Sequence, residues 1–94
     1  MNKAAKEAFE SRAELRIEFP EKLSETSRLV LERVRGLVRD GDLREVGRGV
    51  FQGPVVACGS MAENGEALCM EYEFPSGQCL ALFRDEDYAF SVKS

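Results

Sequence analysis

The clearest hydrophobic pattern along the chain repeats with the period of an α-helix. Its five apolar positions fall within a sector of about 120° on a helical projection. They are Val30, Leu31, Val34, Leu37 and Val38. Ser24 is a suitable N-cap ahead of them, and Gly41 is a suitable residue to follow the last turn. The pattern therefore predicts one main helix over residues 24–40.

Two shorter patterns precede this helix. Ala5, Phe9 and Ala13 follow one another at intervals of four, which predicts a helix or a loosely docked arm over residues 1–14. Residues 15–19 then alternate between apolar and charged side chains, which is typical of a half-buried strand. Pro20 ends this predicted strand.

The period changes to two after the helix. Residues 46–52 and 55–61 are strand-like, and Asn64-Gly65 predicts a type I′ hairpin turn. The register that follows from this turn pairs Glu63 with Glu66, Met61 with Leu68, Gly59 with Met70, Ala57 with Tyr72 and Val55 with Phe74. Beyond the glutamate pair, every partner on that face is apolar or glycine, as a buried hairpin face requires.

Two further strands complete the predicted sheet. Residues 79–83 are apolar on both faces, which favours a central strand covered on both sides, and residues 88–92 alternate in a last strand. We expect a single α+β domain over residues 1–94, in which an antiparallel meander of about four to five strands packs against the helix. The predicted strands at 15–19 and 88–92 are candidate edges through which a homodimer could form.

The charges divide the chain into two unlike halves. The net charge is −4, but residues 1–49 carry eleven Lys/Arg and ten Asp/Glu, whereas residues 50–94 carry two and seven. Five carboxylates of the second half are expected on or beside adjacent strands, and they are Glu71, Glu73, Asp85, Glu86 and Asp87. They are either a solvated surface or an acidic patch that attracts a cationic partner, such as a protein with a basic or nucleic-acid-binding surface.

The residues needed for common catalytic and metal sites are missing. The chain contains no histidine, which excludes the commonest general base and the usual zinc ligand. Cys58, Cys69 and Cys79 form no CxxC motif, so we expect buried, reduced thiols without a metal or other cofactor. We therefore expect a protein that is not an enzyme.

An alternative interpretation begins with the arginines of the first half. A basic face is formed by Arg28, Arg35, Arg39, Arg44 and Arg48. Residues 37–51, with Gly47-Arg48-Gly49 at a predicted hairpin tip, resemble the helix-to-wing segment of winged-helix DNA-binding domains. The resemblance implies a DNA-binding transcriptional regulator. The chain departs from that family before the helix, where a strand and a proline replace the helix-turn-helix core.

These observations order the functional hypotheses. The first is a small non-catalytic protein-binding module, an inhibitor or regulatory protein of the kind that phages and mobile elements supply, acting through its acidic surface. The DNA-binding regulator is the alternative. No apolar run reaches the length of a membrane span, and neither a signal peptide nor paired cysteines are evident, so we expect a cytoplasmic protein without a membrane partner.

Overall fold

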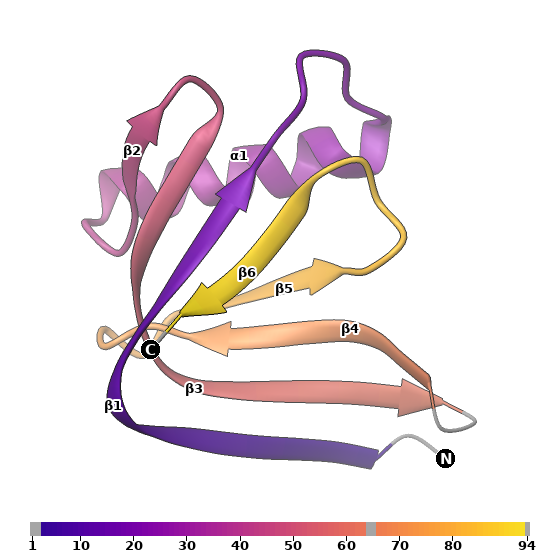
Figure 1. Ribbon diagram of the computed structural model, residues 1–94. Coiled ribbons are helices and arrows are strands. Elements are labelled where there is room, and N and C mark those ends of the chain that lie inside the picture. The colour runs from indigo at the N-terminus through magenta and orange to yellow at the C-terminus, as the bar shows by residue number, and fades with distance from the viewer. Residues whose placement is uncertain (1–2, 64–65, 94) are drawn as a thin grey trace.

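The computed structural model describes the backbone of residues 3–63 and 66–93, and the side chains of residues 13–60 and 69–93. Over these residues the chain forms one helix and six antiparallel strands, an α+β fold (Figure 1). The elements are β1 (Lys3–Glu18), α1 (Glu25–Arg39), β2 (Arg44–Gly47), β3 (Val50–Glu63), β4 (Glu66–Glu73), β5 (Cys79–Phe83) and β6 (Ala89–Lys93).

The caps of α1 confirm the helix predicted over residues 24–40. The Ser24 side chain accepts a hydrogen bond from the Ser27 N–H at 3.2 Å. At the other end Gly41 adopts a φ of 88°, a conformation that glycine tolerates without steric cost. The N–H groups of Gly41 and Asp42 donate to the carbonyls of Val38 and Leu37, the two bonds of a Schellman motif.

The N-terminal segment is a strand, so the predicted helix or arm over residues 1–14 is wrong. Its first half, Lys3–Ala8, pairs with β3, and so does its second half, Ala13–Glu18. Between Ala8 and Ala13 there are five steps along β1, whereas their partners Ala57 and Val55 are only two steps apart on β3. An irregularity in the pairing therefore separates the two halves of β1. The helical spacing of apolar residues is overridden here by pairing with β3, because strand formation depends on tertiary context.

The sheet bends so that each half of β3 has its own neighbours. Residues 50–52 of β3 lie between β2 and the second half of β1, whereas residues 57–62 lie between β4 and the first half of β1. The strand order is β5-β4-β3-β1-β6, with β2 added beside β3. The meander runs only through β3, β4 and β5, because β6 returns to pair with β1.

Two predictions about edge strands are corrected by this order. Residues 15–18 lie between β3 and β6 and are not an edge. Residues 79–83 were expected to be central, but β5 ends the sheet order and its exposure alternates, with Leu80 and Leu82 buried and Phe83 exposed. An apolar run alone does not reveal whether both faces of a strand are covered.

The hairpin register agrees with the prediction only next to the turn. Asn64-Gly65 lies outside the described residues, and Glu63 pairs with Glu66 as expected. A β-bulge then adds one residue on β4, so Cys58, and not Ala57, lies opposite Tyr72. Tyr72 still faces the core, since the bulge changes its partner on β3 and not its own face.

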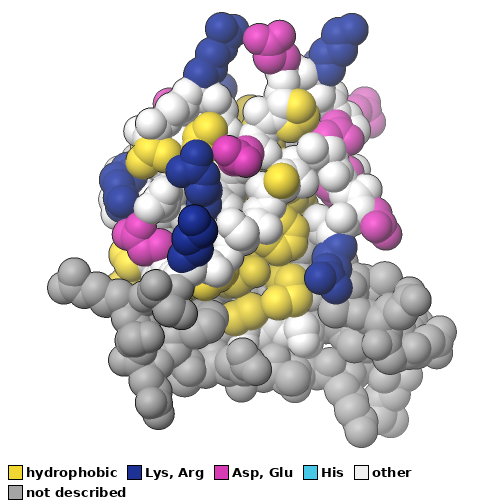
Figure 2. Space-filling model, in the orientation of Figure 1, with side chains coloured by type: hydrophobic (Ala, Val, Ile, Leu, Met, Phe, Trp, Pro, Cys, Tyr) yellow, Lys and Arg dark blue, Asp and Glu magenta, His cyan; other side chains and the backbone are white. Residues whose placement is uncertain are grey.

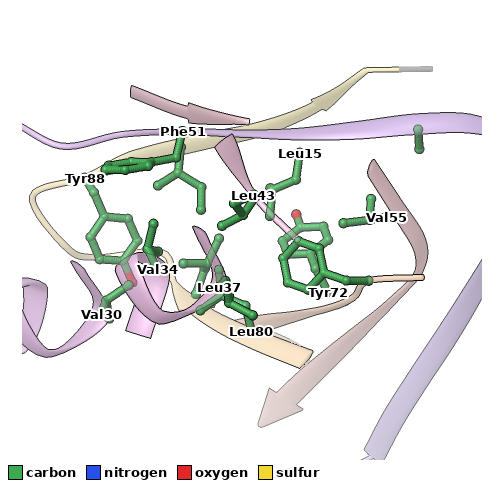
Figure 3. Packing of buried hydrophobic residues seen from close by; sticks show 14 residues of the cluster. Leu15, Val30, Val34, Leu37, Leu43, Phe51, Val55, Tyr72, Leu80 and Tyr88 are labelled. Atoms are coloured by element: carbon green, nitrogen blue, oxygen red, sulfur yellow. The ribbon is translucent and has the colours of Figure 1, made fainter. Parts of the chain in front are cut away.

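The core lies between the bent sheet and α1 (Figures 1 and 3). Its fully buried side chains include Leu15, Ile17, Val34, Leu37, Phe74 and Leu82. Gly53 of β3 passes so close to the Asp42 carbonyl that a side chain there would collide with it. Among the described residues, no helix has the length and apolar character needed to cross a membrane.

Candidate binding surfaces

The β4–β5 pair presents different residues on its two faces. The pairs Cys69–Phe83, Glu71–Ala81 and Glu73–Cys79 share the outward face. The pairs Met70–Leu82 and Tyr72–Leu80 share the face that turns toward the core. The Phe83 ring is therefore placed on the outside, where the residue remains 42% exposed.

A cavity of about 340 Å³ lies beside Phe83 and is called the Phe83 pocket here. It is lined by Thr26 from the first turn of α1, by Phe83 at the end of β5, and by Asp85 and Glu86 from the following turn. Its walls thus combine an aromatic ring, a hydroxyl and two carboxylates. Such a pocket can accept an apolar group that is accompanied by positive charge.

Two of the predicted acidic residues also hold the start of α1. The Ser24 N–H donates to Asp87 Oδ2 at 2.7 Å, and the Ser24 hydroxyl lies 3.4 Å from Glu86 Oε2. A carboxylate is favoured at this end of a helix because the unpaired N–H groups and the helix dipole are both positive there. Glu86 and Asp87 therefore stabilise the fold in addition to contributing negative charge.

The structure divides the predicted acidic patch. Asp85 and Glu86 border the Phe83 pocket, and Glu71 lies on the same outward face, two residues along β4 from the position opposite Phe83. Cys69 is the residue opposite Phe83, and Glu73 lies four residues further along β4. This separation is about 13 Å at the rise of a strand. The acidic surface around Phe83 therefore consists of Glu71, Asp85 and Glu86, and Glu73 lies at a distance from it.

The predicted basic face is diluted by carboxylates. Arg28, Arg35 and Arg39 are exposed along α1. The Arg44 guanidinium lies 3.5 Å from a carboxylate oxygen of Glu14, and the Arg48 guanidinium lies 3.9 Å from a carboxylate oxygen of Glu21. The ion pairs reduce the positive potential that a nucleic-acid backbone would meet, and Figure 2 shows basic and acidic side chains interspersed over the visible face.

The hairpin expected from the winged-helix resemblance is present. Strands β2 and β3 pair directly after α1, and Gly49 in their turn has a φ of 71°. A groove of about 470 Å³ lies between this hairpin, α1 and the end of β1, and both Arg35 and Arg48 line it together with Glu21 and Glu45. In the described part of the chain α1 is the sole helix, so a helix-turn-helix core does not accompany the hairpin.

The cysteines are less buried than expected. Cys58 and Cys69 are half-buried, and Cys79 is exposed, so the prediction that all three are buried is wrong. Cys58 faces the core beside Tyr72, whereas Cys69 and Cys79 share the outward face of β4 and β5. Burial raises the pKa of Cys69, and the nearby Glu71 carboxylate raises it further. Among the described residues, no group of three potential metal ligands converges on one point.

A third hollow was not predicted from the sequence. It encloses about 430 Å³ and is called the aromatic pocket here. Its lining residues come from β4, β6 and the turn between β5 and β6, and they are Met70, Tyr72, Arg84, Tyr88, Ala89 and Phe90. The alternation of Tyr88 and Phe90 was visible in the sequence, but their position opposite β4 depends on the curvature of the sheet.

Tyr72 is the most perturbed titratable group of this pocket. Its pKa is raised from 10.0 to about 12, mainly by burial and also by the neighbouring Cys58 thiol, while the positive charge of Arg84 acts in the opposite direction. Burial also raises the pKa of Tyr88. Both tyrosines are therefore neutral at physiological pH and can act as hydrogen-bonding groups but not as charged ones.

No protein-family model matches this chain, and neither a curated protein nor a solved structure matches it significantly.

Proposed function

We propose that the chain is a small non-catalytic protein-binding module, an inhibitor or regulatory protein that recognises its partner through the acidic surface around Phe83. The observation that carries the proposal is the exposed Phe83 ring beside a cavity whose rim bears Asp85 and Glu86. Glu71 adds negative charge on the same face. An inhibitor or regulator of this size and acidity would be of the kind that phages and mobile elements supply.

The arrangement matches the anatomy of protein interfaces. Their energetic centres are commonly aromatic side chains in pockets, and a polar rim around the centre adds specificity and speeds association. Phe83 has the aromatic role here, Asp85 and Glu86 form one side of the rim, and Glu71 adds negative charge on the same face. The partner that fits is a protein with an apolar side chain flanked by Lys or Arg.

The test begins with affinity capture from cells that encode the chain, followed by calorimetry with the purified captured protein. Phe83→Ala should weaken binding about tenfold or more, because truncation of an aromatic hot spot has effects of this size. Val56→Ala is the matched control, since Val56 is an exposed apolar residue of β3 with 40% exposure and does not line the Phe83 pocket. Equal affinities of wild type and Phe83→Ala would contradict the proposal.

Charge reversal tests the rim separately. The double variant Glu71→Lys, Asp85→Lys leaves Glu86 and Asp87 in place to hold Ser24, so the start of α1 is preserved. It should slow association and remove most of the dependence of the association rate on salt. An unchanged association rate would show that the carboxylates have no part in recognition.

DNA binding is the second candidate, favoured by the exposed Arg35 and Arg39 of α1 and by the Arg48-Gly49 turn between β2 and β3. It predicts retention on heparin at low salt and a gel shift with duplex DNA, both lost in the variant Arg35→Ala, Arg39→Ala. Such a result would replace the protein-binding proposal.

A further inference from the structure

The aromatic pocket lies where the curled sheet fails to close. Strands β5 and β6 stand at opposite ends of the sheet order, and no pairing joins them among the described residues. The curvature nevertheless brings β6 across β4, since the rings of Tyr72 and Phe90 lie 6.1 Å apart. The Phe83 N–H also donates to the Tyr88 hydroxyl at 2.7 Å. The space between these ends is comparable to the mouth of a β-barrel, a common position for a ligand site.

The walls of this pocket are fixed by aromatic packing. The Phe90 ring lies 6.1 Å from Tyr72 and 6.2 Å from Tyr88, so it bridges the two tyrosines. Both tyrosines are only 4% exposed and are therefore held by the core, whereas Phe90 and Met70 are half-buried. A ligand would thus meet a preformed apolar floor, which lowers the entropic cost of binding.

Among the described residues that line the pocket, Arg84 is the one that carries a charge. It is exposed, and within the described part of the chain its guanidinium has no carboxylate partner at ion-pair distance. The Tyr88 hydroxyl accepts a hydrogen bond from the Phe83 N–H, so the guanidinium of Arg84 supplies the donors at the open side of the pocket. The nearby Glu86 is hydrogen-bonded to Ser24 beyond the turn. The donors at the pocket are therefore suited to an anionic group.

We infer that the aromatic pocket binds a small molecule in which an aromatic ring is joined to a carboxylate, with the ring against Met70 and Phe90 and the carboxylate at Arg84. The volume of about 430 Å³ lies within the range of small-molecule sites. A planar guanidinium matches a carboxylate with two parallel hydrogen bonds, and aromatic rings favour edge-to-face and offset contacts with another ring.

The pocket offers its own spectroscopic probe. The chain has two tyrosines and no tryptophan, and both tyrosines line the pocket. A bound ligand should therefore change the tyrosine emission of the whole protein. The probe pair is 3-phenylpropionate and its neutral amide, 3-phenylpropionamide, because they share shape and differ in charge. Amide NMR shifts of residues 84 and 88–90 would confirm that the ligand occupies this pocket.

The expected result is saturable binding of 3-phenylpropionate that is about tenfold tighter than binding of the amide, as a charge-assisted hydrogen-bonded pair should give. Arg84→Gln should remove this difference and leave the affinity for the amide unchanged. Arg28→Gln is the matched control, because Arg28 is an exposed arginine of α1 and does not line the pocket. It should leave both affinities as in the wild type.

Three outcomes would overturn the inference. The first is a lack of saturable binding at millimolar concentration, and the second is equal affinity for the acid and the amide. The third is unchanged acid binding in Arg84→Gln, checked by circular dichroism to be folded. Because neither Phe83→Ala nor Val56→Ala alters a residue that lines this pocket, failure here and failure of the protein-binding proposal would be distinguished.

Discussion

The two faces of the β4–β5 pair have opposite chemical character, although the same strands form both. The outward face is acidic and holds one exposed aromatic ring, Phe83, beside Glu71 and Asp85. The inward face is apolar and aromatic, and its open end holds one cation, Arg84, beside Tyr72. Phe83 and Arg84 are neighbours in sequence. Phe83 is an apolar ring on the acidic outward face, whereas Arg84 is a cation beside the aromatic pocket.

The difference between the two faces follows from the two-residue period of side chains along a strand. Successive side chains point to opposite faces, so a single step along the chain separates two candidate sites. Under the two proposals, each face is selective through one contrasting residue: the aromatic ring among carboxylates recognises a cationic protein with an apolar side chain, and the guanidinium among aromatic rings recognises an aromatic acid. Substitutions at neighbouring positions should therefore have unrelated consequences.

The largest contrast is expected between truncations at Leu82 and Phe83. Leu82 is fully buried, so Leu82→Ala should lower the free energy of unfolding by about 3 kcal/mol through lost burial and a residual cavity. Phe83 is 42% exposed, and Phe83→Ala should cost about 1 kcal/mol or less. Urea unfolding of both variants checks this, and equal losses would show that the two faces are not distinct.

A smaller effect is expected at alkaline pH on the inward face. The pKa of Tyr72 is about 12 in the folded protein and 10.0 in an unfolded chain, because burial disfavours the phenolate. The unfolded state therefore releases its proton first, and the stabilisation is complete below pH 10 and is lost as the pH rises through about 12.

The measurement is the free energy of unfolding from pH 9 to pH 12, followed in parallel with tyrosine absorbance. The wild type should lose stability faster than Tyr72→Phe between pH 10 and pH 12, since that variant lacks the ionising group. Parallel profiles would show that Tyr72 ionises as readily in the folded state as in the unfolded one.

The smallest difference in stability is expected between substitutions of Asp85 and Asp87, two acidic residues of the turn between β5 and β6. Asp87 accepts the Ser24 N–H at 2.7 Å, so Asp87→Ala should lower the free energy of unfolding by about 1 kcal/mol through the loss of a helix-capping interaction. Asp85 is exposed and borders the Phe83 pocket, so Asp85→Ala should change stability by less than about 0.5 kcal/mol. Thermal unfolding compares the two, and a loss of similar size in Asp85→Ala would contradict the division of roles.

Local signals were sufficient for the features that depend on a few consecutive residues. The helix over Glu25–Arg39 follows from its apolar stripe, the Ser24 cap and the Gly41 turn. The second half of β1 follows from strict alternation at Leu15 and Ile17, both of which are fully buried. These features could be predicted because the apolar pattern and the caps that reveal them lie within a few consecutive residues, although the strands that pair with β1 are distant in sequence.

The candidate sites were predicted only in part. Asp85 and Glu86 do border a pocket, but the role of Glu86 and Asp87 at Ser24 joins residues more than sixty positions apart in sequence. Phe83 was assigned to a covered strand, because an apolar run gives no information about the sheet edge. The aromatic pocket was missed altogether, since its walls come from β4 and β6, which are not paired with each other.

The α+β class, the one main helix and the unequal distribution of charge could be predicted from local patterns in the sequence. Three further features could not: residues 3–8 form a strand, a bulge places Cys58 opposite Tyr72, and β6 returns to β1. These features depend on strand partners, bulges and sheet curvature, which are set by contacts distant in sequence. Those same contacts place Phe83 and Arg84 in two different sites.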